Sequence, residues 1–263
     1  MTFFVMHCAI SPTQLEMLVP GAMLALAMGA AIAERRLEVD AFHAIEIRTR
    51  ATAEIRQAPV SSVVVSGDPR LVQCVGARIM NGRLVIGLPG PGFGDRSSTP
   101  AGGYIVVTGR RACPRVGDVQ RLRIQIAAPL VDDVVIREHD IVKVSPMVVP
   151  AFAARITGLG EVAIDGLRAS STSLSVPGMG RIVVSGTLGQ LKIAISGEGS
   201  VDARGAEARA LELSIGGRGD VVAIVNGPAI GSVAGRGTVA IGGRPTCAIR
   251  KLGTGRITCP AAM

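Results

Sequence analysis

Bulky aromatic side chains are nearly missing from this sequence. It has no tryptophan and one tyrosine, and aromatic residues make up 2% of its 263 residues. Few side chains are therefore available to stack on nucleobases, and the arginines are scattered singly along the chain. We expect no nucleic-acid binding from such a chain. Its formal charge of +8 still permits attraction to an anionic surface or an acidic glycan.

Metal-binding and cofactor-binding motifs are also lacking. The sequence has three histidines and no Cys-x-x-Cys pair, so a zinc site has little support. The stretch "GEGSV" at 197–201 has neither the lysine nor the third glycine of a phosphate-binding loop. In "GGRGD" at 216–220, Asp220 lies one place early for a calcium-binding nonapeptide. The Arg-Gly-Asp tripeptide in that stretch is interpreted as a chance product of the repeat. We predict no metal and no cofactor.

Residues suited to catalysis are few and poorly placed. Asp132 and Asp133 are adjacent, so in a strand they point to opposite faces, which weakens a paired-carboxylate site. His139 beside Asp140 could act as a base, but a surface turn is the commoner arrangement. Three lysines are too few for a strong anion-binding groove. We therefore expect that the protein is not an enzyme.

Glycine, in contrast, is abundant, with 34 residues, and it recurs at a fixed period. The pattern Gly-x-Gly-x-(Val/Ile) occurs six times, with 18 to 20 residues from one copy to the next. Its glycines are Gly158 and Gly160, Gly178 and Gly180, Gly197 and Gly199, Gly217 and Gly219, Gly235 and Gly237, and Gly253 and Gly255. Such a period is the signature of a solenoid.

Aliphatic residues alternate with polar ones on both sides of each glycine pair. Ile193 and Ile195 precede Gly197, for example, and Val201 and Ala203 follow it. A period of two indicates strands, so we predict an all-β fold: a parallel β-solenoid with coils of about 19 residues. The glycines then form structural turns, where they permit a positive φ and a close backbone approach.

Stacking of the coils brings equivalent corner positions about 4.8 Å apart. Glu161 is then predicted to lie beside Arg181, and Glu198 beside Arg218. Exposed pairs of this kind contribute little to stability.

The N-terminal 33 residues are predicted to be an export signal. Residues 17–33 form an uncharged Ala/Leu/Met-rich run that ends in Ala31-Ile32-Ala33, a small-x-small cleavage pattern. Residues 1–16 lack the expected lysine or arginine, so an uncleaved anchor is the alternative, although 17 residues are short for a membrane span. After signal removal we predict no transmembrane span.

The remaining chain divides into two parts by regularity. Residues 34–150 are predicted to be an irregular β segment that continues and caps the solenoid, and 151–263 to be its regular coils. Within the first part, Asn81-Gly82 predicts a hairpin with a type I′ turn, and 88–103 predicts a loop. Arg137–Ile141 precedes the first glycine pair by about one period, where a corner is expected.

Four cysteines remain once Cys8 is removed with the signal: Cys74, Cys113, Cys247 and Cys259. An even number in an exported chain predicts two disulfides. Three pairings are possible, and the chain order favours Cys74 with Cys113 and Cys247 with Cys259. The second bridge would close the last coil.

The repeated units "LKIAISGEGSVDA" and "LELSIGGRGDVVA", together with the closing "CAIRKLGTGRITC", resemble the putative auto-transporter adhesin, head-GIN-domain family. The resemblance covers roughly residues 37–259. It implies a right-handed parallel β-helix from the bacterial cell envelope. The family has no established catalytic or binding residues, so the resemblance assigns none here.

These observations together predict a non-catalytic binding or structural module, exported to the periplasm or the cell surface. Its expected partner is an envelope component, a glycan or a protein that the sequence does not identify, and a homo-oligomer is compatible with the repeat. One alternative is a polysaccharide-active β-helix enzyme. Another is an envelope scaffold that self-assembles end to end through its exposed edges.

Overall fold

A computed structural model describes residues 32–88, 104–105, 113 and 122–260. Most of the predicted export signal, including Cys8, and most of the predicted loop at 88–103 lie outside the described residues. Ala31–Met263 forms one compact unit, and all statements below concern this unit.

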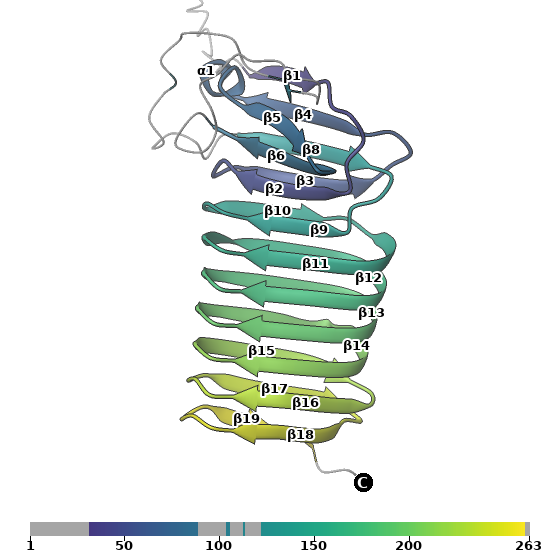
Figure 1. Ribbon diagram of the computed structural model, residues 1–263, viewed down its shortest axis with the longest axis vertical. Coiled ribbons are helices and arrows are strands. Elements are labelled where there is room, and N and C mark those ends of the chain that lie inside the picture. The colour runs from purple at the N-terminus through teal and green to yellow at the C-terminus, as the bar shows by residue number, and fades with distance from the viewer. Residues whose placement is uncertain (1–31, 89–103, 106–112, 114–121, 261–263) are drawn as a thin grey trace, which may run out of the picture. The chain divides into compact units, whose positions relative to one another are not determined.

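Three long strands form the regular part of the solenoid: β12 (Leu159–Val176), β13 (Met179–Ile195) and β14 (Glu198–Ile215). They pair in parallel, and Leu159 lies in register with Met179, which lies in register with Glu198. The offsets between these partners equal the glycine spacing. The predicted all-β parallel solenoid with coils of about 19 residues is therefore confirmed (Figure 1).

The C-terminal coils repeat this arrangement with shorter strands. They are β15 (Arg218–Val225), β16 (Pro228–Val233), β17 (Thr238–Gly243), β18 (Thr246–Lys251) and β19 (Arg256–Thr258). One side of the solenoid runs through β14, β15, β17 and β19, and the other through β14, β16 and β18, all in parallel pairs.

The parallel stack also extends toward the N-terminus. Its strands there are β9 (Asp133–Ile136), β10 (Asp140–Val144), β11 (Met147–Ile156), β2 (Ala44–Arg48) and β3 (Thr52–Gln57). β2 pairs with β9 and β3 pairs with β10, although about 90 residues separate them in the chain. The coil that contains β9 and β10 is thus covered by strands from a distant segment of the chain.

Antiparallel pairing begins beyond this coil. β6 (Arg83–Gly87) and β8 (Arg123–Ala128) still lie parallel to β2 and β3, but β4 (Ser62–Gly67) pairs antiparallel with β8 and with β1 (Ala33–Leu37). β5 (Gly76–Met80) pairs antiparallel with β6 and with β7 (Tyr104–Ile105). A short helix, α1 (Pro69–Val72), lies among these strands (Figure 1).

The β5–β6 hairpin turns at Asn81 and Gly82, as predicted. Both residues have a positive φ, 51° and 72° respectively. This is the combination that a type I′ turn requires, and Asn and Gly adopt it more readily than other residues.

Small aliphatic side chains stack in ladders inside the coils. One ladder consists of Val162, Ile182, Val201, Val221 and Val239, which follow one another in register and are all buried. Each coil interior is filled by its own residues and by the equivalent residues above and below. The core therefore needs few aromatic side chains, which accounts for their scarcity.

Candidate binding surface

The glycine corners allow the closest approach between coils. A Cβ atom added to Gly197 would overlap the carbonyl oxygens of Gly178 and Pro177, and one added to Gly217 would overlap that of Gly197. The carbonyls of Gly178 and Gly197 also accept inter-coil hydrogen bonds; the Glu198 N–H donates to the Gly178 oxygen over 2.9 Å. The lack of a side chain is what lets the backbones pair here.

Of the two reasons predicted for these glycines, a positive φ is wrong for most of them, whereas a close backbone approach agrees with the structure. Among the twelve, a positive φ occurs at Gly160 and Gly237. Gly197 and Gly199 do not have one, so the backbone there is open to any residue. They are needed because the carbonyl oxygens of the neighbouring coil occupy the space of a Cβ.

A hollow of about 460 Å³ lies along this corner. Its lining is mixed: at equivalent positions of successive coils, Leu159 and Met179 lie between His139 and Glu198. The lining side chains include those of Arg50, Arg137, Glu138, His139, Leu159, Pro177, Met179 and Glu198. Exposed Leu159 and Met179 lie in register with each other.

The corner charges pair partly as predicted. Glu198 and Arg218 lie in register and form an ion pair of 3.3 Å. Glu161 also lies in register with Arg181, but the Arg181 guanidinium pairs instead with Asp202 over 3.4 Å. Hydrogen bonds from the Arg204 side chain, more than any other contact, lower the pKa of Asp202 to about 2. These partners lie at the surface, where such pairs contribute little to stability.

Asp140 departs from the predicted surface turn. His139 is exposed, but Asp140 is fully buried, with 0% of its surface accessible. Its Oδ1 accepts hydrogen bonds of 2.8 Å from the Ala51 N–H and the Thr49 hydroxyl. Burial raises its pKa despite these bonds. Asp140 therefore supports the corner of the neighbouring coil, and does not form a catalytic pair with His139.

A second hollow, the sheet-face depression, lies on the outer face of β2, β9, β11 and β12 and measures about 490 Å³. Its charged lining residues are Glu46, Arg83, Asp133, Arg137 and Arg155, and its hydroxyl groups belong to Thr157, Ser173 and Ser175. Adjacent coils place these residues side by side: Arg155 lies in register with Val135 on one side and Ser175 on the other.

Both carboxylates of the sheet-face depression are bound by arginines. Glu46 is 6% exposed and pairs with Arg48 and with Arg137, the latter over 2.9 Å. Burial alone would raise the pKa of Glu46, but the hydrogen bonds from Arg137 and Arg48 outweigh it and lower the pKa. Asp133 pairs with Arg83. Glu46 is thus held ionised, which makes it a poor general acid.

The adjacent Asp132 faces another partner, the His43 imidazole, with 3.0 Å between Asp Oδ1 and Nδ1. Asp132 and Asp133 therefore do not form a carboxylate pair, in agreement with strand alternation. Within the part of the chain that the structure describes, no three His, Cys, Asp or Glu side chains gather in a way that could hold a metal ion.

Sequence reasoning missed the sheet-face depression. Glu46 and Arg137 are 91 residues apart in the chain. In the sequence, Glu46 is a single polar residue between aliphatic ones, and Arg137 belongs to the expected corner at 137–141. Only the pairing of β2 with β9 brings them together. No local motif could have indicated this contact.

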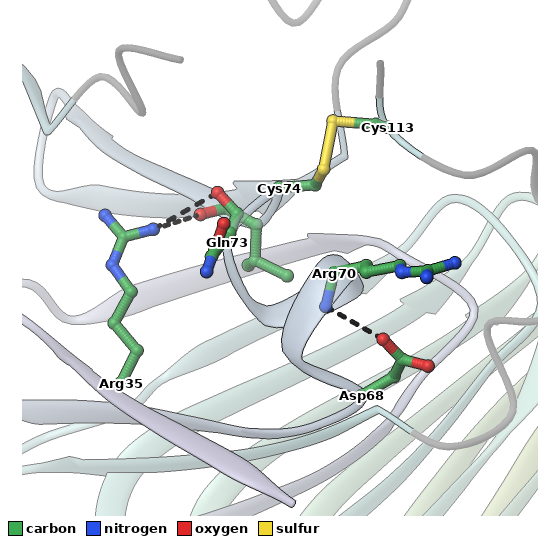
Figure 2. The surroundings of a disulfide bond; sticks show 7 residues. Arg35, Asp68, Arg70, Gln73, Cys74 and Cys113 are labelled. Atoms are coloured by element: carbon green, nitrogen blue, oxygen red, sulfur yellow. Dashed lines mark hydrogen bonds between the residues drawn. A yellow bond between two sulfur atoms is a disulfide. The ribbon is translucent and has the colours of Figure 1, made fainter. Parts of the chain in front are cut away.

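The structure contains two disulfides. Cys74 is bonded to Cys113, with Cα atoms 5.9 Å apart, and Cys247 to Cys259, with Cα atoms 6.7 Å apart. Figure 2 shows the first bridge at the end of α1, where Arg35 reaches the carbonyl oxygen of Gln73. The second bridge lies in the last coil, where Cys247 lies in register with buried Ala229 of the preceding coil.

A parallel β-solenoid with these surface hollows defines an all-β repeat protein. The model of the family described as "Putative auto-transporter adhesin, head GIN domain" matches residues 41–245, and the chain belongs to this family. Among the described residues, none of the helical structure is long and apolar enough to cross a bilayer.

Solved structures share the fold at low sequence identity. A putative adhesin from Bacteroides fragilis is 18% identical, with a TM-score of 0.69 over 87% of this chain and 97% of that chain. A putative lipid binding protein from Parabacteroides distasonis is 15% identical, with a TM-score of 0.58 over 87% and 97% of the two chains. A putative adhesin from the same species is 14% identical, with a TM-score of 0.58 over 87% and 96%. No curated protein matches the chain.

Proposed function

We propose that the protein is an exported, non-catalytic β-helical binding module of the bacterial cell envelope. The observation that carries this proposal is the state of the sheet-face depression: its carboxylates Glu46 and Asp133 are both engaged by arginines. An enzyme that cleaves polysaccharides by acid catalysis needs a carboxyl group that carries a proton. The hydrogen bonds from Arg137 and Arg48, which lower the pKa of Glu46, oppose that role. Membership in an adhesin-named family supports a binding function.

The partner that suits the sheet-face depression is an envelope glycan or protein with acidic and hydroxyl groups. Arg155 is exposed, and no ion pair involves it in the described chain. Ser173 and Ser175 lie beside it on β12. A guanidinium with neighbouring hydroxyls can hold a carboxylate and hydrogen-bond a sugar or a peptide.

We predict that the protein binds an acidic polysaccharide such as polygalacturonate or alginate without cleaving it. Replacing Arg155 by alanine should weaken binding about ten-fold, because a hydrogen bond to a charged group is lost. Arg168→Ala, which removes an exposed arginine outside the lining of the depression, should leave binding unchanged. Isothermal titration measures the affinity, and a reducing-end assay measures cleavage.

Time-dependent release of reducing ends, abolished by Glu46→Gln or Asp133→Asn, would establish the enzyme alternative. Equal binding by the wild type and Arg155→Ala would remove the depression as the site.

Export is a separate prediction. Ala33 is the first residue of β1, where it pairs with Gly67. Cleavage after Ala33 would leave Glu34–Leu37 to pair with β4, so the antiparallel end of the fold would remain complete. Protein recovered from the envelope of its host should begin at Glu34, as intact-mass measurement can show. Recovery of the full-length chain from the cytoplasm would contradict export.

A further inference from the structure

Acidic residues are missing from the C-terminal end of the sequence. Asp220 is the last aspartate or glutamate, and the following residues up to Met263 include five cations. They are Arg236, Arg244, Arg250, Lys251 and Arg256. Arg250 and Lys251 are adjacent but the other three stand singly, so a search for longer basic runs does not find them.

Coil stacking gathers four of these cations around one corner. Arg250 and Lys251 end β18, and Arg256 begins β19 just after the corner. Arg236 lies at the same corner one coil earlier, where its backbone forms a parallel β-bridge with that of Arg218. All four side chains are exposed, and within the described residues none takes part in an ion pair. The prediction of scattered cations is therefore wrong for this end of the fold.

A large apolar side chain projects from the same corner. Leu252 is 71% exposed, and its N–H donates to the Val233 carbonyl of the preceding coil. In earlier coils the same hydrogen bond is made by Ala234, Gly216 and Ser196. Those corners carry small residues, whereas the last coil presents a leucine flanked by cations.

We propose that this corner, the tip formed by Arg236, Arg250, Lys251, Leu252 and Arg256, docks on a lipid bilayer surface that carries anionic headgroups. Basic residues near such a surface attract it, and an exposed apolar side chain gains by entering the interface. A soluble polyanion would bind the cations but would offer no apolar phase in which to bury the leucine. The proposal goes beyond the binding role of the sheet-face depression and does not depend on it.

A second copy of the chain suits the tip poorly. A buried ladder runs through Val176, Ile195, Ile215 and Val233 and ends at Lys251 in the last coil. A lysine at a core position of an edge strand blocks further stacking. Contact between two tips would also bring like charges together. The last coil is thus poorly suited to end-to-end assembly.

The test uses Ala31–Met263, the compact unit that contains the described core. Sedimentation with vesicles of equal parts phosphatidylglycerol and phosphatidylcholine measures its partition coefficient. The triple variant Arg250→Gln, Lys251→Gln, Arg256→Gln should lose roughly five-fold for each cation, on the order of 100-fold in all. Leu252→Ser should weaken binding as well, and high salt should weaken it further.

The matched control removes three exposed cations elsewhere: Arg56→Gln, Arg168→Gln and Arg209→Gln. It has the same net charge as the tip variant and should lose less than ten-fold. Circular dichroism checks that both variants fold.

Three results would overturn the proposal: no preference for anionic over pure phosphatidylcholine vesicles, equal losses in the two triple variants, or tip-dependent binding to soluble polygalacturonate or duplex DNA without vesicle binding. Polysaccharide binding through Arg155 is measured separately, so failure at the tip leaves the proposed function standing.

Discussion

Replacing Gly197 by valine is expected to lower the free energy of unfolding by about 3 kcal/mol. The new Cβ would meet the carbonyl oxygens of Gly178 and Pro177 in the preceding coil. Relief requires the two coils to separate, which breaks the hydrogen bond from the Glu198 N–H to Gly178. Urea denaturation followed by circular dichroism measures the loss.

The neighbouring Glu198→Ala variant is the control. Glu198 is exposed and its pair with Arg218 lies at the surface, so its loss should cost less than about 1 kcal/mol. Gly197→Ala should already be clearly destabilising, because the clash begins at the Cβ. The φ angle of Gly197 is not positive, so backbone strain does not contribute to this loss. An alanine variant as stable as the wild type would disprove the close-approach explanation.

Removing the terminal disulfide by Cys247→Ser and Cys259→Ser is expected to destabilise the last coils by about 3 kcal/mol, the loop entropy of a bridge spanning 12 residues. Cys247 continues the ladder of Leu191, Leu211 and Ala229, and no further coil among the described residues covers it. The bridge holds the two sides of this end coil together.

Trypsin provides a local measurement, because Arg250, Lys251 and Arg256 all lie in the last coil. Cleavage after these residues should accelerate in the double serine variant and spare the earlier coils. Removal of the Cys74–Cys113 bridge is the control, since it acts at the antiparallel end. Equal tryptic rates at the last coil in wild type and double serine variant would show that the bridge does not secure this end.

The repeating part of the fold was predictable because its determinants are local. Alternation around Gly197 and the period of the glycine pairs specify strands and coil length, and the observed registers follow them. The Asn81-Gly82 turn is equally local. The antiparallel pairing of β4 with β1 and β8 was not predicted, because alternation in a single strand does not indicate the direction of its partner.

The role of individual charged residues was harder to predict. Asp140 read as part of a polar surface turn, yet it is buried because it binds the backbone of a corner 89 residues away. Arg181 forms its ion pair with Asp202 instead of with its register neighbour Glu161. Strand register places the backbones, but the conformation of the long arginine side chain determines which carboxylate it contacts.

The sequence by itself determined the coil: its length, its inward aliphatic ladder and its glycine corners, since each follows from residues within one repeat. Tertiary structure alone decided which charged residues lie together on the surface. The sheet-face depression joins Glu46 to Arg137, and the tip joins Arg236 to Arg256, across coils. Stacking converts distances along the chain into neighbouring positions about 4.8 Å apart, so single polar residues become clusters only when the coils are in register.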